Sequence, residues 1–206
     1  MLIAVSGNIG AGKTTLVQRL SARLGYRAEY EAVYDNPYLQ RFYEDMKRWS
    51  FPLQVYFLSH RFQQGLSLRD IGPHVVLDRT IYEDAHIFAR NLYESGYMSA
   101  TDYQTYLKLY ENMVSLVPAP GLMIYLKGSP EKMAERIAGR GKSGERTYEG
   151  EIPLQYLSDL NERYESWIQK EYTYSPVIQI NVEETDLNDE ASFEKLVETV
   201  QKYKDA

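Results

Sequence analysis

The sequence predicts a single α/β domain of 206 residues, built on a five-stranded parallel sheet flanked by helices. Two observations lead to this prediction. Short apolar runs alternate with amphipathic stretches along the chain, and a glycine-rich loop directly follows the first apolar run. Strands that alternate with helices form crossover units on a parallel sheet, and ligands bind at the carboxyl ends of such strands. The sequence contains no linker, internal repeat or low-complexity tract that would divide it.

Five segments are expected to form the strands. Four are short apolar runs typical of buried strands, namely Leu2–Ser6, Val75–Leu77, Leu122–Leu126 and Val177–Ile180. The fifth, Tyr26–Val33, is less regular because Arg27, Glu29 and Glu31 interrupt its apolar alternation.

Helices are expected between the strands. Several of them begin at a proline, which suits a first helical turn because its missing N–H would have no partner there. The glycine-rich stretch Gly139–Gly144 is expected to be a mobile loop inside the domain. The predicted helices are Thr14–Leu24, Pro37–Arg48, Pro52–Leu68, Ile81–Ser95, Ser99–Val117, Pro130–Ala138 and Pro153–Lys170.

Composition excludes several classes of function. The formal net charge of −6 argues against a polymeric nucleic acid as partner, because such partners require a basic surface. The chain has no cysteine, which excludes disulfides and thiolate metal sites and suits a reducing compartment, so the expected location is cytoplasmic. No run of about 18 apolar residues is present, so no membrane span is expected.

The loop after the first strand carries the strongest signal. Its pattern matches a phosphate-binding P-loop in the right context, with a strand before it and a helix after it. Backbone N–H groups of such a loop point inward, and the helix adds the positive end of its dipole. The nucleotide-binding residues expected here are Gly7, Asn8, Ile9, Gly10, Ala11, Gly12, Lys13, Thr14 and Thr15.

Within this loop, Lys13 is expected to reach the β- and γ-phosphates of ATP and to act in catalysis. The Thr14 hydroxyl is expected to ligate the Mg²⁺ that bridges those phosphates, and Thr15 begins the helix. The alternatives are a glycine-rich turn that binds nothing and a nucleotide sensor without catalytic activity.

Charged residues at the ends of two other predicted strands suggest catalysis. Glu31 could accept the proton of an attacking hydroxyl as general base, although exposed glutamates at strand ends are common. Asp78 and Arg79 directly follow Leu77, where phosphates and metal are expected. Asp78 is assigned to Mg²⁺ and Arg79 to the charge of the transferred phosphoryl group; the alternative is a strand-end ion pair.

A second group of residues suggests a pocket for a nucleobase. Gln54, Phe57 and Arg61 lie on one stripe of the predicted helix 52–68, where buried polar groups would need partners such as a base edge. Asp84 and Phe88 form an i, i+4 pair that could balance Arg61 and stack on the base. Core packing is the alternative explanation.

Cations gather around the glycine-rich stretch: Arg136, Arg140, Lys142 and Arg146. Like charges at i, i+4 repel unless an anion lies nearby, and ATP phosphates would be that anion. We expect a lid at about residues 136–150, against the alternative of a solvated basic loop.

Together these motifs resemble the deoxyribonucleoside kinase family, and most closely its bacterial members that phosphorylate deoxyadenosine, deoxycytidine or deoxyguanosine. The resemblance implies a P-loop kinase fold, a three-layer sandwich with an arginine-rich lid, with ATP and Mg²⁺ as cofactors and a homodimeric assembly. The segments that carry it are Gly7–Thr14, Glu31–Val33, Asn36–Leu39, Trp49–Phe51 with Gln54, Asp78–Thr80 and Arg140–Lys142.

The resemblance also implies roles for single residues. It makes Glu31 the general base, Asp78 the magnesium-associated acid, Arg79 the catalytic-site arginine and Gln54 the reader of the base. It assigns Tyr43 and Glu145 to the sugar 3′-hydroxyl, with Glu149 as a competing ligand, and Arg140 with Lys142 to the lid. Lys142 departs from the family's arginine and loses the planar fork that binds phosphate.

The expected reaction transfers the γ-phosphoryl group of ATP to the 5′-hydroxyl of a deoxynucleoside in nucleotide salvage. Family members that prefer deoxycytidine and purine deoxynucleosides carry an Arg and Asp pair at the positions of Arg61 and Asp84, so the resemblance implies that thymidine is not the substrate. The resemblance also ranks deoxyadenosine and deoxycytidine ahead of deoxyguanosine. The alternatives are a nucleoside monophosphate kinase similar to thymidylate kinase and a non-catalytic ATP-binding regulator. Residues 182–190 are a candidate contact for the donor base.

Overall fold

The computed structural model describes residues 1–31, 36–72, 74–142 and 152–204, and of residues 70, 71 and 140–142 it describes the backbone alone. Its sheet has five parallel strands in the order β2-β3-β1-β4-β5. They are β1 (Leu2–Gly7), β2 (Arg27–Glu29), β3 (Val75–Asp78), β4 (Leu122–Lys127) and β5 (Val177–Asn181). The predicted parallel sheet is therefore confirmed, although β2 is shorter than the predicted segment 26–33.

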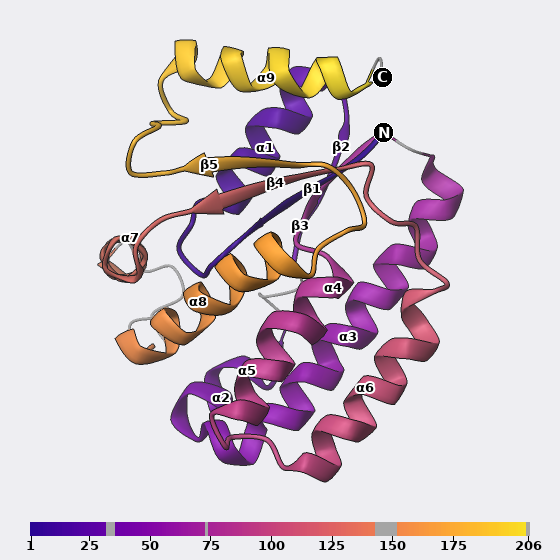
Figure 1. Cartoon of the computed structure of the whole chain (residues 1–206), viewed down its shortest axis with the longest axis vertical. Helices are drawn as coiled ribbons and strands as arrows, with labels where there is room; N and C mark the ends of the chain where they lie inside the picture. The colour runs from indigo at the N-terminus through magenta and orange to yellow at the C-terminus, as the bar shows by residue number, and fades with distance from the viewer. Residues whose placement is uncertain (32–35, 73, 143–151, 205–206) are drawn as a thin grey trace.

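The helices form one layer on each face of this sheet (Figure 1). α1 (Lys13–Leu24) and α9 (Glu190–Lys204) cover one face, where Ile3 and Val5 of β1 join their apolar side chains in one core cluster. The other face carries the larger helical layer, and Ala4 belongs to its cluster. Neighbouring residues of β1 point to opposite faces because side chains alternate along a strand. The predicted three-layer α/β fold is confirmed.

The predicted helices 37–48 and 52–68 are divided differently in the structure. α2 (Leu39–Glu44) ends at Asp45, and α3 (Met46–Ile71) begins there and continues through Pro52. The Asp45 side chain accepts a hydrogen bond from Arg48 N at 3.0 Å, which caps the new helix. Expecting a helix to begin at Pro52 was therefore wrong, because the cap at Asp45 starts α3 before the proline.

The predicted helix 81–95 contains a widened segment. It consists of α4 (Ile81–Glu83), the π-helix η1 (Asp84–Ala89) and α5 (Arg90–Glu94). π-helical turns in proteins are often found at functional sites. This one carries Asp84 and Phe88, two of the predicted site residues.

The remaining helices are α6 (Ala100–Val114), α7 (Pro130–Lys142) and α8 (Leu154–Lys170). α7 extends past the predicted end at Ala138, so the prediction of a loop from Gly139 was wrong over residues 139–142. A glycine inside a helix costs only about 1 kcal/mol relative to alanine, which neighbouring turns can offset. α9 was not predicted, although Phe193, Val197 and Val200 follow helical spacing and are buried.

Candidate functional site

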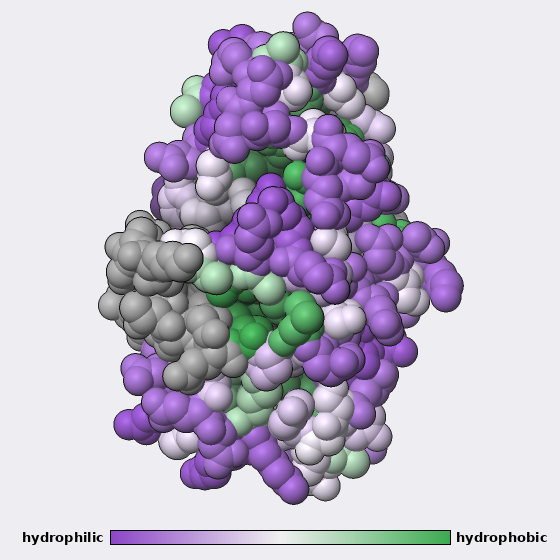
Figure 2. Space-filling model, turned by 90° about the vertical axis from the view of Figure 1, so that its left-hand side faces the viewer, coloured by the Kyte–Doolittle hydropathy of each residue, from purple (hydrophilic) through white to green (hydrophobic). Residues whose placement is uncertain are grey.

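The predicted site residues meet where the strands end. The carboxyl ends of β1 and β3 border a cavity of about 510 Å³ that is lined by the phosphate loop on one side and by α2, α3 and η1 on the other. Figure 2 shows the face of the molecule that lies on the left in Figure 1, which is hollowed near its middle, with apolar residues inside and hydrophilic residues around. One cavity therefore holds both the expected phosphate site and the expected base site.

The phosphate loop has the backbone conformation that its glycines permit. Gly10 and Gly12 have φ angles of 87° and 94°, in the left-handed region. A Cβ on Gly10 would lie 2.7 Å from the carbonyl oxygen of Met133 in α7, so a side chain has no room there. Asn8 connects the loop to α8, because its buried amide donates a hydrogen bond to the carbonyl oxygen of Leu157 at 2.9 Å. Gly7 and Asn8 thus shape the loop, whereas residues 9–15 line the cavity.

Lys13 is buried at the floor of this loop. Its ammonium donates to the carbonyl oxygen of Asn8 at 2.8 Å. Burial, and secondly the charge of Arg79, lower the pKa of Lys13 to about 7, although Asp78 and Glu31 act in the opposite direction. A nearby anion would restore the charged form, as expected of a phosphate-binding lysine.

Thr14 in the first turn of α1 and Asp78 at the end of β3 come together. The Thr14 hydroxyl donates to Oδ2 of Asp78 at 2.6 Å, and Oδ1 of Asp78 is buried without a hydrogen-bond partner. One carboxylate and one hydroxyl are suitable for Mg²⁺, which binds a few protein oxygens and takes its other ligands from phosphates and water. Within the described residues there is no group of three or more His, Asp or Glu that would form an all-protein metal site.

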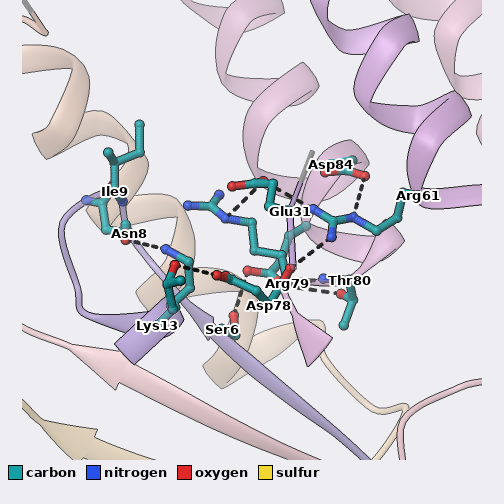
Figure 3. Close-up of polar contacts among 12 residues, drawn as sticks. Ser6, Asn8, Ile9, Lys13, Glu31, Arg61, Asp78, Arg79, Thr80 and Asp84 are labelled. Atoms are coloured by element: carbon teal, nitrogen blue, oxygen red, sulfur yellow. Dashed lines mark hydrogen bonds and ion pairs between the residues drawn. The ribbon is translucent and has the colours of Figure 1, made fainter. Parts of the chain in front are cut away.

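Glu31 lies between two arginines (Figure 3). Its Oε1 is 3.1 Å from a terminal nitrogen of Arg61 and 3.5 Å from Nε of Arg79, and the two guanidinium groups approach it from opposite sides. The Arg79 guanidinium also lies over the ring of Phe88, with 4.4 Å from Cζ to the ring centroid. The predicted base, the predicted arginine and the predicted aromatic residue are therefore in direct contact.

Arg61 lies behind the cavity wall rather than in it. The guanidinium bridges Oδ2 of Asp84 at 3.4 Å and the carbonyl oxygen of Asp78 at 2.9 Å, in addition to Glu31. Asp84 itself lines the cavity. Burial, which outweighs the opposing effect of Arg61, raises the pKa of Asp84 to about 7. The predicted pair exists, and in this geometry Asp84 is the member that faces a ligand.

The far end of the cavity is lined largely by aromatic and apolar side chains. Tyr43 from α2, Gln54 and Phe57 from α3 and Phe88 from η1 line it, as the sequence predicted. Oε1 of Gln54 is buried and has no hydrogen-bond partner in the described part of the protein. Four further lining residues were not predicted, because their apolar side chains give no local sign of a site: Leu39, Phe42, Leu53 and Tyr156.

The lid prediction is described in part. Arg136 in α7 lines the cavity and donates to the carbonyl oxygen of Ala11 at 3.0 Å, which joins α7 to the phosphate loop. The backbone of Arg140 and Lys142 lies in α7, and their side chains, like the whole of Glu145 and Glu149, lie outside the described residues. Residues 182 and 185–188 also line the cavity beside the phosphate loop, where the donor base was expected.

None of the helices in the described part of the chain combines the length and the apolar character that crossing a bilayer requires.

Comparison with known proteins agrees with this geometry. The model of the deoxynucleoside kinase family matches residues 3–204. A deoxyadenosine/deoxycytidine kinase of Bacillus subtilis is 42% identical over 202 residues, which cover 97% of this chain and 91% of the relative. A deoxyadenosine kinase of Dictyostelium discoideum is 45% identical over 179 residues, or 87% of this chain and 71% of the relative.

Among solved structures, deoxyadenosine kinase from M. mycoides with bound dATP superposes with a TM-score of 0.85 and 31% sequence identity, covering 98% of this chain and all of the other. The P-loop kinase fold that the sequence implied is therefore confirmed. Because the family model spans nearly the whole chain and a relative that is 42% identical is matched over 91% of its length, this protein belongs to the deoxynucleoside kinase family of ATP-dependent kinases.

Proposed function

We propose that the chain phosphorylates the 5′-hydroxyl of deoxyadenosine and deoxycytidine with ATP, for nucleotide salvage. The observation that carries this proposal is the single cavity of about 510 Å³ that joins the phosphate loop to the space between Gln54, Phe57, Asp84 and Phe88. Glu31 and Arg79 lie between the two ends. A nucleoside with its base in the far end would therefore direct its 5′-carbon toward the phosphates.

The preference among bases follows from hydrogen-bond chemistry. Adenine and cytosine present an exocyclic amino group, whereas thymine and guanine present a carbonyl oxygen at the corresponding edge. Asp84, when ionised, is an acceptor only, whereas the Gln54 amide can either accept or donate. A carbonyl oxygen facing Asp84 would leave a buried acceptor unpaired, at a cost of about 1–3 kcal/mol. The names of the relatives described above, which act on deoxyadenosine or deoxycytidine, support the same preference.

In the proposed transfer, Glu31 takes the proton of the nucleoside 5′-hydroxyl. The oxygen of that hydroxyl forms a bond to the γ-phosphorus, and the bond between the γ-phosphorus and the oxygen of the leaving ADP breaks. Arg79 and Lys13 offset the negative charge on the transferred group. Positioning and electrostatics supply most of the acceleration in such reactions. Arg61 keeps Glu31 and Asp84 in fixed relation, because its guanidinium contacts both.

Thr14 and Asp78 are the residues that would hold Mg²⁺, and the free Oδ1 of Asp78 supports this assignment. Mg²⁺ when bound would neutralise charge on the phosphates. We also propose that the sugar 3′-hydroxyl is bound by Tyr43, which lines the cavity, together with Glu145 or Glu149. Arg140 and Lys142 remain proposed lid residues.

The experiment that tests the proposal compares kcat/KM for deoxyadenosine, deoxycytidine, deoxyguanosine, thymidine and thymidine monophosphate, with ATP and Mg²⁺. The first two should be the best substrates. Highest turnover with thymidine monophosphate would favour the monophosphate kinase alternative, and ATP binding without turnover of any acceptor would favour the regulator.

The role of Glu31 is tested by Glu31→Gln. Loss of a general base lowers kcat by about 10²- to 10⁴-fold, while ATP affinity should stay the same. Glu29→Gln is the matched control, because Glu29 lies on the same segment but does not line this cavity. Near-normal kcat in Glu31→Gln would remove Glu31 as the base.

A homodimer and a cytoplasmic location remain part of the proposal. α3 and α6 pack side by side and carry apolar positions that would permit a helical interface between two copies. Light scattering on the purified protein would test this, and a monomeric mass at micromolar concentration would contradict it.

A further inference from the structure

Glu83 is a buried carboxylate that the proposed reaction does not use. It stands in the first turn after β3, at the N-terminal end of α4, and its side chain has no exposed surface. Four donors reach it: the Thr80 backbone N–H at 2.9 Å, the Thr80 hydroxyl at 3.2 Å, the Ser6 hydroxyl at 2.9 Å and the Tyr164 hydroxyl at 2.9 Å. A buried carboxylate is costly unless it is hydrogen-bonded in this way.

Helix capping explains only half of this arrangement. Oε2 of Glu83 accepts from the Thr80 backbone N–H and from the Thr80 hydroxyl. The first of these bonds is half of a capping box at the start of α4, and the other half is the bond from the Glu83 backbone N–H to the Thr80 side chain. Oε1 points away from the cap and accepts from Ser6 of β1 and Tyr164 of α8. The same side chain therefore connects three elements that meet around Arg79.

The Tyr164 hydroxyl joins Glu83 to Arg79. A phenol has one hydrogen, and Tyr164 gives it to Glu83, so its oxygen lone pairs are left for the N–H of Arg79 at 3.3 Å. Burial, and the nearby Glu83, raise the pKa of Tyr164 well above its ordinary value although Arg79 opposes them, so this proton stays in place. The ring is fixed by stacking on Tyr125, with 5.8 Å between ring centroids.

Arg79 depends on such support. Its backbone has a φ of 70°, in the left-handed region that non-glycine residues seldom adopt. Apart from Tyr164, the contacts described for its guanidinium are the 3.5 Å approach of Nε to Glu31 and the ring of Phe88. The hydrogen bond that the terminal nitrogen NH1 of Arg79 donates to the Tyr164 hydroxyl therefore sets the direction of that nitrogen.

We propose that Glu83 is a positioning residue, which acts through Tyr164 to orient the Arg79 guanidinium toward the transferred phosphoryl group. This inference rests on the role proposed above for Arg79. Glu83 therefore differs from an ordinary helix cap. Its Oε2 caps α4, whereas its Oε1 binds Tyr164, which contacts Arg79.

Glu83→Gln tests the inference with little change in volume. The Thr80 backbone N–H can only donate, so the amide oxygen of the new side chain takes its place beside Thr80 and the NH₂ group faces Tyr164. The amide then donates to the phenol oxygen and competes with Arg79 for its lone pairs, while the phenol hydrogen loses its acceptor and the hydroxyl must turn away from Glu83. The direction of the hydrogen bond between residue 83 and Tyr164 is reversed, and the bond from Arg79 to Tyr164 is weakened.

The expected result is a fall in kcat of about tenfold to a hundredfold, the effect of one hydrogen bond to a charged group, with KM for ATP and nucleoside within about twofold. Tyr164→Phe should give a similar fall, and the double variant should be no worse than either single one, because both break the same connection. Ser6→Ala is the control: it removes another bond to Oε1 but does not touch Arg79, so it should lower the melting temperature and leave kcat unchanged.

Normal kcat in folded Glu83→Gln, or additive losses in the double variant, would overturn the inference. If Glu83→Gln does not fold, Tyr164→Phe tests the inference instead, because unchanged kcat in that variant would also overturn it. Arg79→Ala separates this from a failure of the proposed function: unchanged kcat in Arg79→Ala would refute the role of Arg79 itself, whereas a large fall there with normal kcat in Tyr164→Phe refutes only the connection to Glu83.

Discussion

Binding of ATP should be coupled to proton uptake by the protein, and the protonation of Lys13 should determine the number of protons taken up. In the ligand-free protein, burial and Arg79 lower the pKa of Lys13 to about 7. Phosphates beside the ammonium favour its charged form and raise the pKa again. With a free pKa of about 7, half of Lys13 is neutral at pH 7 and nearly all of it at pH 8.5. Binding should then take up about 0.5 proton at pH 7 and nearly one at pH 8.5.

Isothermal titration calorimetry measures this uptake. Titrations with ATP and excess Mg²⁺ are repeated in buffers of different ionisation enthalpy, and the slope of the observed enthalpy against that quantity is the number of protons bound. Lys13→Met should abolish the difference between the two pH values. Equal uptake at pH 7 and pH 8.5 in the unaltered protein, or the same pH dependence in Lys13→Met, would refute the reasoning.

Two further predictions concern the acceptor site and the core. Asp84 has a pKa of about 7, and only its ionised form offers two charged acceptor oxygens and no donor to the amino group of the base, so KM for deoxyadenosine at saturating ATP should rise about tenfold from pH 8 to pH 6. Asp84→Asn should flatten this profile; an unchanged profile in that variant would assign it to another group. Gly65→Ala should lower the free energy of unfolding, measured with urea, by about 1–3 kcal/mol because overpacking outweighs the gain in helix propensity. Its Cβ would lie 2.4 Å from Cγ1 of Val117, so Val117→Ala should restore part of the loss, and a stabilised Gly65→Ala would contradict the packing.

The parts of this protein that the sequence predicts well are those with a local cause. Four of the five strands are mostly apolar runs, and β1 is buried along its whole length. The phosphate loop combines glycines, a lysine and a threonine at fixed spacing, and the structure confirms the left-handed conformations that its glycines permit. Asp78 and Arg79 follow a strand directly, so their place at the carboxyl edge of the sheet could be predicted too.

The parts that were missed depend on contacts between distant segments. Tyr164 reaches Glu83 across 81 residues, and neither side chain lies in a pattern that marks a site. The start of α3 depends on the cap at Asp45. Pro52 lies six residues after the first residue of α3, and the sequence prediction took it for the start of the helix. Arg61 was expected to touch the base because it interrupts an apolar stripe. Its contacts with Glu31 and Asp84 satisfy the same need for partners, which the sequence alone does not distinguish.

The π-helical segment Asp84–Ala89 makes the length of the chain here as important as its side chains. A π-turn is closed between residues five apart, one more than in an α-helix, so it holds an extra residue. Deleting one residue, such as Ala85, would let the segment return to α-helix, and the turns on either side would keep nearly the same orientation because the π-turn absorbs the extra residue. The wide turn that carries Asp84 and Phe88 would be lost, although no side chain of the cavity had been replaced. Homologous chains should therefore accept substitutions in this segment more readily than a change in its number of residues.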